Sequence, residues 1–241
     1  MITVSEAFKI AMKAPTRQMV AYLADGVNND LNDKKDLLSV SIKWEGGFLQ
    51  SVMREAKATY MGDYNLLDKY VDIAIGVVLA DDSIEYIDYG AFKVVEAKYD
   101  KATDETSIKM YDKMYEFLQP YESTGFTYPA TPTTLLQELA TKLGISHSIG
   151  SIGNATREFD DVFDTLGLSY RNVLDQVCEA TGSVAYINTN DELVVHKISA
   201  TMKEELDKNV LNSLEVESPF GPITTVVLSR QPQEDNILQN L

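Results

Sequence analysis

Few side chains in this sequence could hold a metal ion, because nitrogen and sulfur ligands are scarce. The 241 residues include only two histidines, His147 and His196, and one cysteine, Cys178. The histidines stand in different segments, with neither a second histidine nor a cysteine near them, so a zinc or iron site would lack ligands. We expect no metal site and no cofactor, and we expect both histidines to be solvated or hydrogen-bonded side chains.

A cysteine nucleophile needs a helix terminus or a nearby cation that lowers the pKa of its thiol. Cys178 falls instead in the middle of a predicted helix, on an apolar stripe with Leu174 and Val177. We therefore expect it to be buried, and the histidines do not complete a catalytic triad with it. A single cysteine also excludes an internal disulfide, which agrees with synthesis in a reducing compartment. We expect no catalytic residue and no enzymatic activity.

Carboxylates are abundant, but their spacing does not indicate a site. Paired acids could cleave glycosidic bonds, yet nothing in the sequence singles out a pair. The densest acidic run, 158–164, lacks the alternating Asp/Asn spacing and central glycine of a calcium loop, so we expect a solvated face. The run 148–154 contains two glycines but has no lysine after it and no predicted strand just before it. It is not a phosphate loop, and we expect it to be a flexible loop.

Aromatic side chains offer two interpretations. At strand spacing they usually pack in a core or between subunits, whereas a row of exposed rings can form a platform for sugars. Both interpretations stay open for five tyrosines: Tyr86, Tyr89, Tyr99, Tyr111 and Tyr115.

The chain is strongly acidic, with a net charge of −16 that both halves share. Binding to nucleic acid requires a positive patch that displaces phosphate counterions, and no basic cluster here exceeds the pair Lys34 and Lys35. We therefore expect no stable binding to nucleic acid. The same acidity would suit a surface past which DNA slides without sticking, and it would equally suit a soluble protein.

Up to about residue 121 the sequence consists of strand-like stretches separated by turn residues. Four stretches of roughly six to ten residues are rich in Val, Ile, Tyr and Thr; they are 17–24, 37–44, 53–60 and 70–79. A hairpin is predicted from two further stretches, 92–99 and 106–112. Strict alternation in its first strand is expected to place four side chains on one face: Phe92, Val94, Glu96 and Lys98.

After Pro120 the pattern changes. Residues 125–132 have the Gly, Pro and Thr composition of a linker, which marks a domain boundary. Two helices are predicted beyond it: one is capped by Thr131 or Thr133 and ends at Gly144, and the other is capped by Ser169 and ends at Gly182. A second hairpin, 183–187 with 192–198, can cover their apolar stripes. Two more strands are predicted at 210–217 and 223–229.

These elements predict an α+β fold that is mainly β. We expect an N-terminal β-barrel-like domain at residues 1–124, a small α/β domain at 125–200, and the start of a second barrel at 201–241 that is left incomplete. The longest apolar stretch, 73–80, falls short of the roughly 18 residues that a membrane helix needs. The N-terminus lacks the features of a secretory signal, so we expect no membrane association and folding in a cytoplasm.

Three stretches resemble phage and prophage tail hub proteins, the group that includes baseplate hubs and the N-terminal region of tail-associated lysins. Residues 86–101, continuing through 106–114, resemble the hairpin of the first barrel in that family. Residues 170–187, followed by Glu192-Leu-Val, are similar to its helix and hairpin, and residues 210–230 look like the return into its second barrel. These are patterns of packing residues, so their shared order along the chain is the stronger evidence.

The resemblance implies a homotrimer whose barrels form a pseudo-hexameric ring. Such a ring would dock on the tail tube, contact tail tube and distal tail proteins, and surround an axial channel for DNA ejection. The protein would be a virion tail component that is made in the cytoplasm of the host bacterium. Lytic extensions found in the family are not carried over, because the sequence ends within the second barrel region. The alternatives are a cell-wall-degrading tail lysin and a carbohydrate-binding module.

Overall fold

The computed structural model describes residues 4–15, 17–25, 37–122, 125–160 and 167–198. Over these residues the fold is α+β and mainly β, as the sequence predicts. The strands are β1 (Met19–Asp25), β2 (Leu37–Glu45), β3 (Ser51–Met61), β4 (Tyr70–Val78), β5 (Ile84–Asp100), β6 (Glu105–Tyr111), β7 (His147–Ile149), β8 (Ser183–Ile187) and β9 (Leu193–Lys197). The helices are α1 (Glu6–Lys13), the 3-10 helix η1 (Lys113–Leu118), α2 (Pro132–Lys142) and α3 (Tyr170–Thr181).

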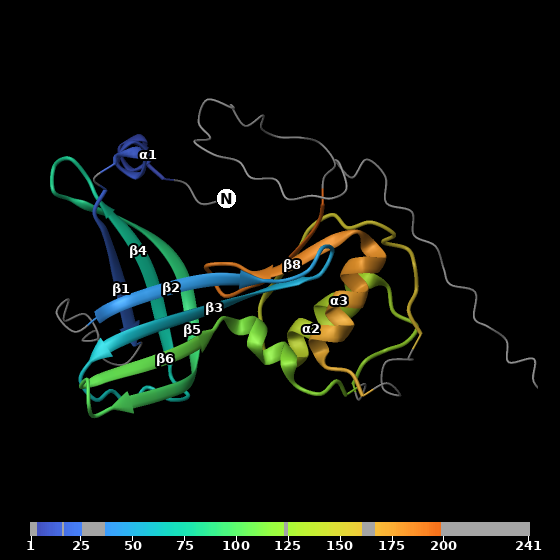
Figure 1. Ribbon diagram of the computed structural model, residues 1–241. Helices are drawn as coiled ribbons and strands as arrows, with labels where there is room; N and C mark the ends of the chain where they lie inside the picture. The colour runs from blue at the N-terminus through green and yellow to red at the C-terminus, as the bar shows by residue number, and fades with distance from the viewer. Residues whose placement is uncertain (1–3, 16, 26–36, 123–124, 161–166, 199–241) are drawn as a thin grey trace, which may run out of the picture. The chain divides into compact units, whose positions relative to one another are not determined.

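The first six strands form an antiparallel sheet in the order β1-β4-β5-β6-β3-β2. All four strands predicted before residue 80 are therefore confirmed, as β1 to β4. Figure 1 shows β4 crossing β2 and β3 instead of running beside them, which reflects a strong twist of the sheet. One face of the sheet encloses a buried cluster, called here the barrel core: Leu23, Ala56, Ala58, Tyr60, Leu66, Val71, Ile73, Phe92, Val94, Ile108 and Met110.

The predicted hairpin is present as β5 and β6, but the expected face is wrong for Glu96 and Lys98. Val94 pairs with Met110, whereas the next pair on that face joins Ala97 to Ile108. A bulge between Val94 and Glu96 inserts one residue and shifts the alternation. Ala97 therefore packs on the barrel core, and Glu96, which was expected to share the face of Phe92 and Val94, pairs with Lys109 on the other face.

Strand β3 joins the two halves of the described fold. Its residues Ser51 and Val52 pair in parallel with Ala185 and Tyr186 of β8, so β8, β9 and β7 extend the same sheet. Met53 packs in a second buried cluster, called here the helix core, while Ala56 and the alternate residues after it face the barrel core. One strand thus contributes to both cores.

Both predicted helices of the second half are confirmed, and their caps explain their limits. The Thr131 hydroxyl accepts a hydrogen bond from the Thr134 amide at the start of α2. Ser169 and Asn172 form a reciprocal capping box at the start of α3, and Gly182 ends that helix in the left-handed conformation. Figure 1 shows α2 and α3 side by side. Their apolar faces bury the helix core, which includes Leu135, Leu136, Leu139, Val173, Leu174, Val177, Cys178, Ala185, Ile187, Leu193 and Val195.

Three further elements were not predicted: α1, η1 and β7. Helix α1 precedes the first strand; Ser5 caps it and Phe8 is its buried residue. The loop predicted at 148–154 is confirmed only for 150–154, since the run begins inside β7, which pairs in parallel with β9. Residues 150–154 are anchored to the end of α3, because the Gly153 amide donates a hydrogen bond to the Thr181 carbonyl at 2.9 Å.

The predicted strands at 210–217 and 223–229 lie outside the described residues, and the expected domain boundaries at 124 and 200 stay predictions. No helix in the described ranges is long and apolar enough to cross a membrane.

Candidate functional site

The structure keeps the two histidines apart from other ligand-type side chains. His147 lies opposite Leu193 in the pairing of β7 with β9. His196 lies on β9, where its ring meets the ring of Tyr186 edge-on at 5.6 Å. Across the part of the chain that the structure describes, no three His, Cys, Asp or Glu side chains gather in a way that could hold a metal ion.

Cys178 is fully buried in α3, as predicted. Burial, together with the nearby carboxylates of Asp175 and Glu179, raises the pKa of its thiol to about 12. The thiol therefore stays protonated at neutral pH, and a protonated buried thiol is a poor nucleophile. In the acidic run, Glu158 and Asp160 are exposed, and the remainder from 161 to 164 lies outside the described residues.

The five tyrosines singled out in the sequence do not form one row. Tyr111 stacks on Tyr115 with ring centres 5.4 Å apart, and the Tyr99 hydroxyl donates to Asp104 at 2.7 Å. Tyr86 and Tyr89 instead lie near each other on β5 and line one pocket with a volume of about 810 Å³. The sequence thus identified two of the residues of this pocket, and the other three tyrosines lie elsewhere.

This pocket, called here the aromatic pocket, is formed by strands and one turn that are distant in sequence. Its main lining residues come from β2, β3, β5 and β8 and from the turn between β8 and β9: Trp44, Arg54, Tyr86, Asp88, Tyr89, Tyr186, Asn188, Thr189 and Asn190. The rings of Trp44 and Tyr89 are tilted at 60° with their centres 6.2 Å apart. Trp44 is 58% exposed and Tyr86 is 42% exposed, so both rings offer free surface to a ligand.

Arg54 is the buried charge of the aromatic pocket. Its Nε donates to Asp112 Oδ2 at 2.9 Å, its Nη1 donates to the Tyr89 carbonyl at 2.6 Å, and its guanidinium lies 5.1 Å from the centre of the Phe92 ring. Its side chain is 7% exposed, and Nη2 has no hydrogen-bond partner among the described residues. A buried donor without a partner is uncommon and calls for an explanation.

Sequence analysis missed Trp44 and Arg54 as pocket residues. A signal was available for each: Trp44 is the only tryptophan, and Arg54 is a charged residue that directly follows Val52 and Met53 in β3. Neither signal says which side chains lie nearby, because the partners of Arg54 are Tyr89 and Asp112, far away along the chain.

A second buried charge, Glu55, lies at the centre of a polar cluster on β3. It accepts a hydrogen bond from the Tyr111 hydroxyl at 2.9 Å and pairs with Lys109 at 3.1 Å and Lys43 at 3.2 Å. Burial alone would raise the pKa of Glu55, but these hydrogen bonds and charges outweigh it and lower the pKa to about 2. Glu55 therefore remains ionised, which suits cross-strand stabilisation of β2, β3 and β6 and does not suit a general acid.

The two end strands of the first sheet, β1 and β2, face a shared groove of about 320 Å³. This edge groove is lined by Met19, Val20 and Ala21 of β1, by residues 37–40 of β2 and by Tyr86. Within the described residues each of these strands pairs on one side only. Met19 is 50% exposed and Leu38 is 46% exposed. Unpaired strand edges with apolar side chains are templates for pairing with another chain.

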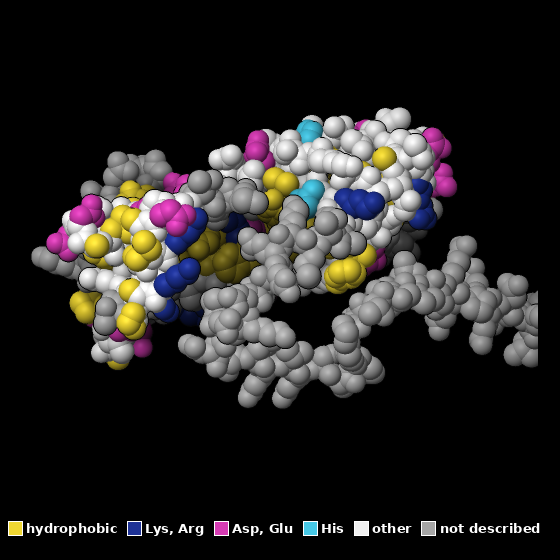
Figure 2. All heavy atoms as spheres, turned by 90° about the horizontal axis from the view of Figure 1, so that it is seen from above, with side chains coloured by type: hydrophobic (Ala, Val, Ile, Leu, Met, Phe, Trp, Pro, Cys, Tyr) yellow, Lys and Arg dark blue, Asp and Glu magenta, His cyan; other side chains and the backbone are white. Residues whose placement is uncertain are grey.

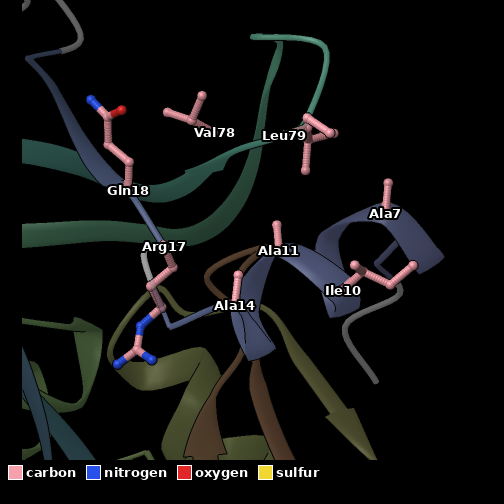
Figure 3. Close-up of a pocket in the computed structure, with 9 residues that line it drawn as sticks. Ala7, Ile10, Ala11, Ala14, Arg17, Gln18, Val78 and Leu79 are labelled. Atoms are coloured by element: carbon pink, nitrogen blue, oxygen red, sulfur yellow. The ribbon is translucent and has the colours of Figure 1, made fainter.

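A third concavity lies between α1 and the end of β4, with a volume of about 430 Å³ (Figure 3). The figure shows Ala7, Ile10, Ala11 and Ala14 on the helix, with Val78 and Leu79 of the β4 segment opposite them. The helix is tied down at its start, where the Ser5 amide donates to Glu85 at 2.8 Å. The resulting helix groove is an apolar surface on a fixed element.

Charged and apolar side chains are interspersed on the face drawn in Figure 2. Such a mixture is typical of a protein surface that also offers apolar contact points.

No family model and no curated protein sequence matches the chain. Solved structures do match. The tail protein from Neisseria meningitidis MC58 is 14% identical with a TM-score of 0.53, over 73% of this chain and 50% of that chain. A chain from the Francisella PdpA–VgrG complex is 10% identical with a TM-score of 0.51, over 83% of this chain and 34% of that chain. The prophage tail protein gp18 from Listeria monocytogenes EGD-e is 14% identical with a TM-score of 0.46, over 73% and 50%.

This chain spans half or less of the length of these proteins. At such low identity the likeness concerns the fold. The chain therefore shares its fold with a tail protein of Neisseria meningitidis and with part of a VgrG complex.

Proposed function

We propose that this protein is a structural component of a phage or prophage tail, the hub at the tail tip, which docks on the tail tube and surrounds a channel for DNA. The observation that carries the proposal is the fold shared with the Neisseria tail protein at a TM-score of 0.53. The three sequence stretches that resemble tail hub proteins point to the same family, and two of them lie on β5 to β6 and on α3 to β9. The proposed location is the virion tail, after synthesis in the host cytoplasm.

The proposed partners are copies of the chain itself and neighbouring tail proteins. The second structural neighbour comes from a complex of PdpA with VgrG, so a protein of this fold is found in a multiprotein assembly. For this chain we propose a homotrimer that contacts tail tube and distal tail proteins.

The edge groove supports assembly through strand edges. A neighbouring strand that pairs with β1 or β2 would satisfy backbone groups along that edge and would cover Met19 and Leu38. The helix groove offers a separate apolar contact for a second partner.

The acidity of the chain supports a channel role and opposes tight DNA binding. A net charge of −16 repels the phosphate backbone, so DNA would pass without being held. An electrophoretic mobility assay at physiological salt is expected to show no stable complex with duplex DNA.

We also propose that the chain carries out no catalysis. The thiol of Cys178 is buried and protonated, and Glu55 is ionised and enclosed by Lys43, Lys109 and Tyr111. Neither arrangement supplies a reactive acid, base or nucleophile. A zymogram against bacterial cell walls tests the tail lysin alternative, and clearing by the purified chain would replace this proposal with that one.

The deciding experiment for the tail role uses phage particles. Gold-labelled antibodies against the chain are expected to bind one end of the tail, and deletion of its gene is expected to give particles without functional tails. Normal tails and normal infectivity after deletion would overturn the proposal.

Light scattering coupled to size exclusion tests the subunit contact. A trimer would have three times the monomer mass of 26.8 kDa. Leu38→Glu places a charge in the edge groove and is expected to shift the trimer toward monomer. Leu67→Glu is the matched control, because Leu67 is 50% exposed but lies outside the groove. Equal effects of the two variants would argue against this edge as the contact.

A further inference from the structure

The aromatic pocket gathers three aromatic rings, of which Tyr86 also lines the edge groove. Three rings, those of Trp44, Tyr86 and Tyr89, lie at one concavity, and Trp44 and Tyr86 keep large exposed fractions of 58% and 42%. Exposed aromatic faces in a concave site bind flat apolar surfaces, and the C–H face of a sugar ring is such a surface.

The polar side chains that line the pocket include Asp88, Asn188 and Asn190. Asp88 is exposed and uses Oδ1 to accept the Gly90 amide at 2.8 Å. A carboxylate oxygen can accept a further hydrogen bond, and a hydroxyl group both donates and accepts. A sugar hydroxyl can therefore donate to Asp88, whereas the Nη2 of Arg54 is fully buried and out of reach of a ligand.

The charge balance disfavours an anionic ligand. Asp112 already neutralises the guanidinium of Arg54 at 2.9 Å, and Asp88 adds a negative charge to the pocket. An anionic ligand would therefore meet repulsion both here and from a chain of net charge −16. A nucleotide or an acidic peptide does not fit this balance.

The wall of the pocket is held in place without a ligand. Gly90 has a φ of +78°, and a Cβ built on it would lie 3.1 Å from the Thr189 carbonyl, so a larger residue would crowd the turn. Asp191 fixes the same turn by accepting the Ala91 amide at 3.4 Å and by pairing with Lys113 at 3.3 Å. A wall that is already ordered reduces the entropy lost when a ligand binds.

We propose that the aromatic pocket binds a short neutral oligosaccharide, with sugar rings packed on Trp44 and Tyr86 and a hydroxyl group bonded to Asp88. The volume of about 810 Å³ lies within the range of small-molecule sites. That the ligand is a surface glycan of a bacterial cell rests on the proposed tail function, whereas saccharide binding by the pocket can be tested without it.

The test follows ligand binding by the fluorescence of Trp44, which lines the pocket and is the only tryptophan in the chain. The full chain is first applied to an array of neutral bacterial oligosaccharides, and the strongest binder is then titrated in solution while Trp44 emission is recorded. We expect a saturable change in emission, and we expect Tyr86→Ala to weaken binding at least tenfold.

Tyr99→Ala is the matched control. Tyr99 lies on the same strand and is 38% exposed, close to the 42% of Tyr86, but it does not line the pocket. Circular dichroism confirms that each variant is folded. The proposal is overturned if the protein binds no neutral saccharide on the array. It is equally overturned if Tyr99→Ala weakens saccharide binding as much as Tyr86→Ala does. It is also overturned if Trp44 emission responds to protein concentration and to no saccharide, since the pocket would then be a subunit contact.

Discussion

Replacement of Asp112 by alanine should destabilise the fold more than any change at an exposed charge, because Asp112 is fully buried beside Arg54. Its side chain is 0% exposed and that of Arg54 is 7% exposed. Asp112 Oδ2 accepts from the Arg54 amide at 3.2 Å and from Nε at 2.9 Å, and Oδ1 accepts from the Met114 amide at 3.1 Å. The carboxylate thus connects β3 to the start of η1.

The size of the effect follows from what Asp112→Ala leaves behind. Removing one partner of a buried ion pair strands the other charge in a low-dielectric environment and costs about 3–5 kcal/mol. The variant also removes the N-cap of η1, which contributes about 1 kcal/mol in typical helices. These contributions overlap, so we expect a loss of about 4 kcal/mol, a large share of the roughly 5–15 kcal/mol that stabilises an average domain.

Urea unfolding followed by Trp44 emission measures this loss. Glu6→Ala is the control, since it breaks the Lys9–Glu6 pair of α1, in which both side chains are more than half exposed. We expect the control to match the wild type. The double variant Arg54→Met with Asp112→Leu should be more stable than Asp112→Ala, because it removes both charges. The reasoning is refuted if Asp112→Ala unfolds at the same urea concentration as the control.

Three further predictions concern single sites. Glu55→Gln should lower the free energy of unfolding by up to about 3 kcal/mol near neutral pH, because the folded pKa of Glu55 is about 2, below its usual 4.5. The difference from the wild type should shrink as pH falls from 4.5 to 2, which urea unfolding at several pH values would show. Cys178 should react with Ellman's reagent only after unfolding, and rapid reaction in the native protein would contradict its burial. Gly153→Ala should lower stability by about 1–3 kcal/mol, since its Cβ would lie 2.4 Å from the Thr181 carbonyl, whereas Gly150→Ala meets its nearest atom at 3.4 Å and should melt like the wild type.

The helices of the second half were predictable because their signals are local. Ser169 and Asn172 lie three residues apart and cap α3 through bonds within one turn. Gly182 ends the same helix because the left-handed conformation is easiest for glycine. A pattern confined to four or five residues needs no knowledge of the rest of the chain.

The bulge in β5 and the short strand β7 were missed for the opposite reason. The register of β5 against β6 depends on which residues oppose each other, and alternation within β5 alone gives Glu96 the wrong face. Strand β7 has three residues, and it is a strand because β9 offers a parallel partner more than forty residues later. Local propensity carries no information on such pairings.

The aromatic pocket was predictable only in part, because some of its residues carry a local signal and others meet only in the fold. Tyr86 and Tyr89 could be selected from sequence, since exposed aromatic residues on a strand suggest a platform. Trp44 reaches them from β2, and the turn at 188–190 arrives from the far end of the described chain. Only the fold shows that these segments meet.

Arg54 explains why stability and the aromatic pocket depend on each other. It lies on β3 between Met53, which packs in the helix core, and Ala56, which packs in the barrel core. At this junction its guanidinium holds the Tyr89 carbonyl through Nη1 and Asp112 through Nε. A change at Asp112 therefore releases the contact that positions Tyr89. Asp112→Ala protein that remains folded should accordingly bind less tightly to any ligand of the pocket, whereas Glu6→Ala protein should bind as the wild type does.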